Sequence, residues 1–115
     1  MNRDTIFIKK GEFEKIFERQ NKVYKFLFET GKIEANITEL EPGSESRLFT
    51  HNGEEVHVII EGELDYTVGD KVYKLSKGDI LWHKSNLGHK ANNHSKSKVI
   101  YLTIGTPPTF KPSMT

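Results

Sequence analysis

Residues 51–66, HNGEEVHVIIEGELDY, place a polar cluster directly before an apolar run. Two histidines and two glutamates fall within the first seven residues, and Val58, Ile59 and Ile60 follow them. Burying an ionised side chain is costly unless its charge is paired or bound to a metal. The segment is therefore either the solvated edge of a strand or the lining of a site beside a buried strand.

The charge and cysteine content of the chain exclude several kinds of partner and chemistry. The 115 residues carry a formal net charge of +1, from 17 basic and 16 acidic residues, which gives no electrostatic attraction to nucleic acid or to an anionic membrane. The chain has no cysteine, so disulfides, thiolate metal ligands and a cysteine nucleophile are excluded. Because the N-terminus lacks an apolar signal region and no run is long enough to span a bilayer, we expect a cytoplasmic protein without nucleic-acid or membrane partners.

Short apolar segments separated by glycine, asparagine and aspartate predict an all-β domain. About eight or nine strands, with turns roughly every ten residues, favour a sandwich or barrel over a βαβ fold. In residues 33–41, Ile33, Ala35 and Ile37 alternate with polar residues, as in a strand with two different faces. Further strands are expected at residues 5–9, 23–29, 56–60, 62–68, 72–75, 80–83 and 98–104, with a hairpin turn at residues 68–71.

Two predictions concern the larger apolar side chains. Between the first two strands, the segment GEFEKIFERQ can form a short helix with Phe13, Ile16 and Phe17 on one face. Trp82 and Tyr101 can line the cavity of the barrel, but large aromatic side chains in a barrel are more often part of the core.

The polar cluster is also a donor set for a metal ion. On a strand, residues of equal parity share a face, so His51, Glu55 and His57 would point the same way. A helix would also bring His51 and Glu55 together, but Gly53 and the β-branched run after it favour a strand. His89, which follows a tight turn, can reach the same place from a neighbouring strand. Two imidazoles and a carboxylate suit Fe, Mn, Ni, Cu or Zn and leave positions open for water or substrate.

Ordinary surface placement is the alternative for these side chains, because histidine and glutamate are common on solvated strands. His57 and His83 can each be a hydrogen-bonded core residue, a group behind the metal ligands or a contact to substrate. His94, in the polar loop NNHSKSK, is expected to be solvated.

The order of glycines and metal-binding residue types resembles the first sequence motif of the cupin family, whose fold is a double-stranded β-helix. That motif contains a glycine, a His-x-His pair, a glutamate and a second glycine at set spacings. The positions that match it are Gly43, His51, Glu55 and Gly62. Phe49 stands where the first histidine belongs, which removes one ligand of the motif and supplies an apolar wall instead.

The second cupin motif also has a partial match. It contains a glycine, a Pro-x-Gly turn, a histidine and an asparagine. The positions that match it are Gly78, His89 and Asn93, whereas Lys84 and Asn86 replace the proline and the second glycine.

The resemblance implies both a domain and a site. It covers about residues 33–106, with the core motifs at 43–106, and implies a single cupin domain over residues 1–115. It also implies a cofactor, a divalent metal ion (Fe, Mn, Ni, Cu or Zn), whose protein ligands would be His51, Glu55 and His89.

A closer resemblance is to the cupin sensor domain that follows a helix-turn-helix in one class of bacterial repressors. The stretches that carry it are HNGEEVHVIIEGEL, YKLSKGDILWHKSNLGH and TPPTF. Because cupins include enzymes, storage proteins and binding proteins without a metal, the barrel does not define a reaction.

Three functions remain open at this point. The first is a metal-dependent cupin that binds or transforms a small polar metabolite, with His57 or His83 as the candidate catalytic residue for proton transfer. The second is a non-catalytic sensor or ligand-binding module, with or without a metal, and the third is a structural barrel. We also expect a homodimer, because the apolar segment around Ile6, Phe7 and Ile8 can pair across chains.

Overall fold

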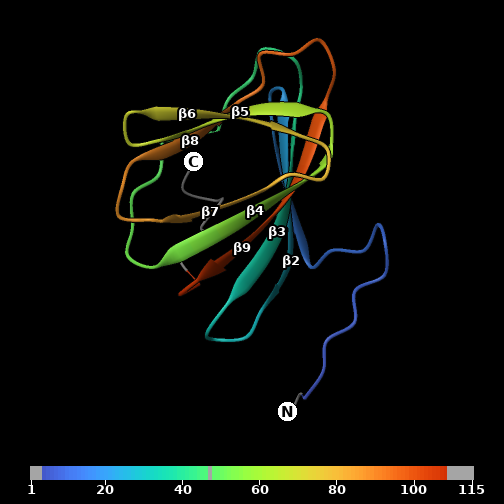
Figure 1. Ribbon diagram of the computed structural model, residues 1–115. Coiled ribbons are helices and arrows are strands. Elements are labelled where there is room, and N and C mark those ends of the chain that lie inside the picture. Colours follow the sequence, from blue (N-terminus) through green and yellow to red (C-terminus); the bar gives the residue numbers. More distant parts are fainter. Residues whose placement is uncertain (1–3, 47, 109–115) are drawn as a thin grey trace.

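A computed structural model describes residues 4–46 and 48–108, which form nine strands and no helix (Figure 1). No helix that could cross a membrane occurs in these two ranges. The strands are β1 (Lys15–Arg19), β2 (Lys22–Glu29), β3 (Glu34–Leu40), β4 (Glu54–Glu61), β5 (Glu63–Val68), β6 (Lys71–Ser76), β7 (Ile80–Lys84), β8 (His89–Asn92) and β9 (Val99–Thr106).

The strands form two antiparallel sheets that face each other across a common core. The six-stranded sheet has the order β1-β2-β3-β9-β4-β7, and the three-stranded sheet has the order β6-β5-β8. Figure 1 shows β5, β6 and β8 lying opposite β4 and β7. The expected all-β, double-stranded β-helix is therefore confirmed. Its buried apolar cluster consists of Leu40, Ile59, Leu64, Tyr66, Leu75, Ala91, Val99 and Tyr101.

The strand register sets which side chains meet at the middle of the larger sheet. β4 lies between β9 and β7, and Glu55 is paired with Gly105 on one side and with His83 on the other. β5 and β6 form the expected hairpin, which closes at the pair Val68 and Lys71. Glu55 and His57 of the polar cluster therefore lie on a strand that is paired on both sides, and not on an edge strand of the sheet.

The N-terminal region differs from its prediction. Residues 5–9 form no strand, and Figure 1 shows this part of the chain running away from the barrel. The helix predicted within residues 11–20 is also wrong, because β1 pairs with β2 as a hairpin. At the turn of this hairpin Asn21 has φ 70°, a left-handed conformation that asparagine adopts more readily than most residues. The turn at Asn21 therefore favours a hairpin, although the spacing of the apolar residues before it suggested a helix.

The two large aromatic residues have different environments. Tyr101 is buried in the core, as expected, whereas Trp82 is 55% exposed, so its predicted burial is wrong. Trp82 lies on β7 opposite Val56 of β4, and the next residue, His83, is buried. Because neighbouring residues of a strand face opposite sides, an inward His83 requires an outward Trp82.

Candidate metal centre

Four histidines surround the carboxylate of Glu55. Glu55 and His57 are on β4 and face the interior, as their equal parity predicts. His83 comes from β7, directly opposite Glu55, and His89 begins β8 in the other sheet. The two sheets thus supply imidazoles from opposite sides of one carboxylate.

His51 reaches Glu55 in a different way from the predicted one. It precedes β4 and is not part of the strand, so strand parity does not explain its position. Its backbone N–H donates to the carbonyl of Ser85 at 2.9 Å, and the chain then turns at Gly53, whose φ is 108°. This turn places the His51 ring beside the side chain that follows it on β4.

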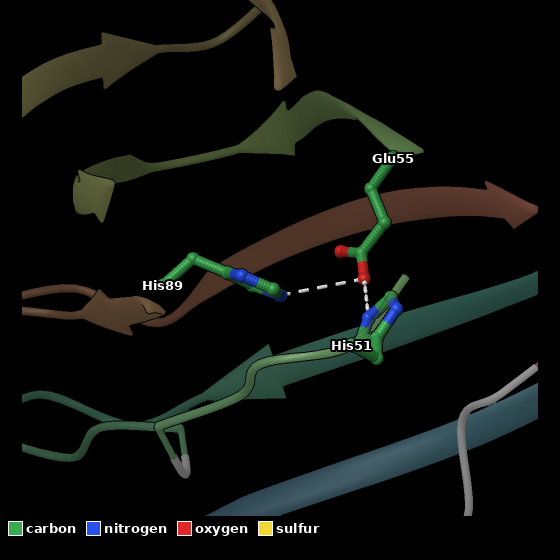
Figure 2. Close-up of side chains that lie close together, drawn as sticks. All are labelled: His51, Glu55 and His89. Carbon is green, nitrogen blue, oxygen red and sulfur yellow. Dashed lines mark hydrogen bonds and ion pairs between the residues drawn. The ribbon is translucent and has the colours of Figure 1, made fainter. Parts of the chain in front are cut away.

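The three predicted metal ligands lie close together (Figure 2). His51 Nε2 is 2.6 Å from Glu55 Oε2, and His89 Nε2 is 3.4 Å from the same oxygen. One ligand atom from each of the three residues lies within 4.8 Å of the others. We name this group, His51, Glu55 and His89, the outer triad.

A second group shares the carboxylate. His57 Nε2 is 3.3 Å and His83 Nε2 is 3.8 Å from Glu55 Oε1, and the two nitrogens are 2.9 Å apart. Ligand atoms of Glu55, His57 and His83 also lie within 4.8 Å of one another. We name this group, Glu55, His57 and His83, the inner triad. Its histidines contact Oε1 of Glu55, whereas those of the outer triad contact Oε2.

Backbone carbonyls determine how three of the rings are protonated. The Nδ1 atoms donate to carbonyl oxygens at 2.8–3.0 Å: His51 to Asn52, His83 to Lys84, and His89 to Leu87. Since a carbonyl only accepts, each Nδ1 carries a proton, and the Nε2 atom of each ring is left to face the interior of the cluster. A metal-binding histidine is held in this way by its other nitrogen in most known sites.

The charges of the cluster depend on burial and on contacts within it. Burial raises the pKa of Glu55, but close contacts with the His57 and His89 rings and their charges outweigh burial and hold the pKa well below its usual range. Burial lowers the pKa of His89, but the nearby negative charge of Glu55 outweighs burial, and the net pKa is raised. The metal-free cluster is therefore an ionised carboxylate beside a readily protonated imidazole.

His57 and His83 form a neutral pair in the metal-free protein. Burial lowers the pKa of His57 and brings the pKa of His83 to about 4. Thr103 Oγ1 is 2.7 Å from His57 Nδ1, so its hydroxyl can donate there while His57 Nε2–H donates to His83 Nε2. This arrangement agrees with one of the three predicted roles, that of a hydrogen-bonded core histidine.

The residues present fit a divalent cation. His89 Nε2 is fully buried and has no hydrogen-bond partner among the residues that the structure describes. Its lone pair faces a carboxylate oxygen at 3.4 Å, an unfavourable contact unless a proton or a cation lies between the two atoms. Two imidazoles and one carboxylate are also a donor set of catalytic metal sites.

A small cavity of about 50 Å³ adjoins the outer triad. His51, Glu55 and Phe49 line it, together with Thr103 of β9 and polar residues of β3. These β3 residues, which the sequence analysis missed, are Glu34, Asn36 and Thr38, and they are 4%, 3% and 2% exposed. The alternation on this strand was recognised, but its polar face and not its apolar face lines the interior.

The histidine expected to be solvated is on the surface. The His94 side chain is 69% exposed, and its Nδ1 lies 2.8 Å from Asp65 Oδ2. It is outside both triads.

Comparison with known families identifies the class of protein. A family profile for the cupin domain matches residues 36–105. The fold and the two sequence motifs agree with this match, and the chain belongs to the cupin family.

Individual relatives support the family and the fold. An uncharacterized protein of Archaeoglobus fulgidus is 38% identical over 64 residues, 56% of this chain and 60% of that protein. An RmlC-like cupin from Shewanella frigidimarina has a TM-score of 0.77 at 19% identity, over 90% of this chain and 92% of that one. The cupin domain of an XRE-family transcriptional regulator from Enterobacter cloacae has a TM-score of 0.72 at 25% identity, over 78% of this chain and 100% of that one.

Proposed function

We propose that this protein is a metal-dependent cupin whose outer triad holds a divalent ion next to a binding site for a small polar metabolite. The observation that carries the proposal is the buried His89 Nε2, which faces Glu55 Oε2 at 3.4 Å without a hydrogen-bond partner in the described ranges. The proposal treats residues 1–115 as one cupin domain with core motifs at 43–106. The outer triad does not distinguish Fe, Mn, Ni, Cu and Zn, because all five accept imidazole and carboxylate ligands.

The chain's own residues would prepare the site for binding. Hydrogen bonds from Nδ1 hold the His51 and His89 rings with Nε2 directed at Glu55. The Phe49 ring, stacked on His89 with centroids 6.0 Å apart, supplies an apolar wall in place of a fourth ligand. A divalent ion at this position supplies Lewis-acid polarisation of a carbonyl or carboxylate of the ligand.

A proton-transfer role for His57 is the catalytic part of the proposal, with His83 as its hydrogen-bond partner. His57 lines the cavity, and burial lowers the pKa of this ring, which leaves it neutral near pH 7. The alternative is a non-catalytic sensor in which the same cavity binds a ligand without turnover. The likeness to the cupin domain of an XRE-family regulator supports that alternative.

A homodimer is a further part of the proposal. The outward face of β4 and β7 carries Ile80, 67% exposed, next to Trp82. Contiguous exposed apolar side chains mark interaction sites in soluble proteins. The N-terminal segment carries Phe7, which is 77% exposed, and such a segment can lie across the sheet of a second copy.

Titration of Zn²⁺ into chelator-treated, dialysed protein tests the metal proposal. Wild type should bind Zn²⁺. His51→Ala should lower the affinity for Zn²⁺ by more than about 10- to 100-fold, because that is the cost of losing only a residue that contacts a metal ligand from behind. His94→Gln, which removes a surface histidine, should bind as wild type does. No binding by wild type, or equal binding by His51→Ala, would leave the metal-free ligand-binding module as the better function.

A further inference from the structure

The inner triad has a geometry that a hydrogen-bonded pair alone does not require. Two ligands about 2.1 Å from a tetrahedral ion lie about 3.4 Å apart. The three ligand separations of the inner triad are 2.9, 3.3 and 3.8 Å, on both sides of that value. An ion can therefore be placed among Glu55, His57 and His83 by small movements of side chains.

The lone pairs of this group are available without rearrangement of the backbone. His83 Nδ1 donates to the carbonyl of Lys84, so its Nε2 is unprotonated in the neutral ring. The partner of His57 Nδ1 is the hydroxyl of Thr103, which can accept as well as donate. When Thr103 accepts, His57 Nε2 also presents a lone pair, at a nitrogen 2.9 Å from His83 Nε2.

Glu55 separates the two triads by its two oxygens. Oε2 is nearest to His51 and His89, and Oε1 is nearest to His57 and His83. The five residues therefore form two groups that share Glu55. A carboxylate between two ions about 3.5–4 Å apart is an arrangement of two-metal sites.

We propose that the inner triad is a second metal position and that Glu55 bridges it to the ion held by the outer triad. The proposal rests on the proposed function for the outer ion and adds a separate one. His57 and His83 are buried, so an ion there is shielded from water and depends on its three protein ligands. The proton-transfer role of His57 then belongs to the protein loaded with the outer ion alone.

The number of Zn²⁺ ions bound per chain tests this inference on full-length protein. Equilibrium dialysis should give about two equivalents for wild type. The double variant His57→Phe/His83→Phe replaces both imidazole ligands of the inner triad with apolar rings. It should lose the Zn²⁺ equivalent bound at the inner triad. His51→Ala should lose the outer equivalent, and Glu55→Gln should lose both. His94→Gln should keep the wild-type number.

A second variant guards against misfolding of the double one. His83→Gln keeps a polar side chain at the position and should also lose an equivalent, and circular dichroism checks the fold of each metal-free variant. A wild type that binds one equivalent, or one whose second equivalent survives in both His83 variants, overturns the inference while the outer ion stands. A wild type that binds no Zn²⁺ overturns the proposed function as well.

Co²⁺ gives an independent readout of the same two positions. Its visible absorption depends on the ligands, so the spectrum of His51→Ala, with only the inner ion, should differ from that of the double variant, with only the outer ion. The two spectra should add to that of wild type. Identical spectra would show that a single position is being filled in both variants and would overturn the inference.

Discussion

Phe49 and His89 lie opposite each other in an isolated antiparallel bridge. Each backbone N–H donates to the carbonyl of the other residue at 2.9 Å, and the two rings stack at an interplanar angle of 29°. Phe49 stands where the first cupin motif has a histidine. Phe49 therefore puts an apolar ring directly beside the predicted ligand His89, at the position where the motif would supply a fourth ligand.

Restoring an imidazole at this position should strengthen metal binding. Phe49→His places a ring next to His89 and at the wall of the cavity, so the affinity for Zn²⁺ should rise by about tenfold or more, which is about 1.4 kcal/mol. Competition with a chelator measures it. Phe49→Leu, which keeps the wall apolar, is the matched control and should not bind more tightly. Equal affinities for Phe49→His and Phe49→Leu would argue against an ion at the outer triad.

The turn before β4 should be sensitive to a single methyl group. At Gly53, with φ 108°, an added Cβ would lie 1.8 Å from the carbonyl oxygen of Thr106. Gly53→Ala should therefore reduce the free energy of unfolding by about 3 kcal/mol or more and displace His51 from Glu55. Chemical denaturation and Zn²⁺ affinity measure the two effects.

Gly43 provides the control for this prediction. It also has a positive φ, 84°, but an added Cβ meets no atom of residues 4–46 and 48–108 within 4 Å. Gly43→Ala should cost only the backbone strain of about 1–2 kcal/mol. If both variants lose the same stability, the contact with Thr106 does not determine the turn.

The sequence predicts the fold and the proximity of three candidate metal ligands for identifiable reasons. Period-two alternation and turn residues locate most strands, and the two motif histidines with Glu55 meet as the resemblance implies. Alternation does not reveal which face of a strand is inside. On β3 the polar residues line the cavity. Hydrophobicity alone would have assigned the apolar face of this strand to the interior and the polar face to the solvent.

The inner triad could not be recognised from spacing. Glu55 and His83 are 28 positions apart in the chain by their numbers, and only the pairing of β4 with β7 makes them neighbours. His57 was noted because it follows Glu55 at equal parity, but its bond to His83 depends on the same pairing. A prediction of which strands are adjacent is needed before such a cluster is visible.

The proposed dimer should depend on the outward face of β7. Ile80→Glu introduces a charge at a 67% exposed position and should convert the dimer to a monomer with little change in thermal stability. Val72→Glu, at a 58% exposed position on β6 of the other sheet, should remain a dimer. Light scattering after size-exclusion chromatography measures both variants. A wild type that is monomeric at high concentration would contradict the proposal.

The two metal positions should respond differently to pH. Protons compete with a metal for imidazole nitrogen. Contact with Glu55 gives His89 a net raised pKa despite its burial, so binding to the outer triad should weaken by up to about tenfold per pH unit as the pH falls below that raised value. Burial lowers the pKa of His83 to about 4, so the inner position should keep its affinity to a lower pH.

Stability of the metal-free protein should change with pH in the opposite direction. Since the folded pKa of His89 is raised, its ion pair with Glu55 contributes fully below the ordinary histidine value and is lost as the pH rises through the folded value. Metal-free wild type should therefore lose part of its stability as the pH rises through the raised pKa of His89, and Glu55→Gln should not show this loss. The pH dependence of metal binding is measured separately. Zn²⁺ titrations between about pH 5.5 and 8 of His51→Ala report on the inner position, and those of His57→Phe/His83→Phe report on the outer position. Parallel pH profiles in these two variants would show that His89 does not control the outer ion.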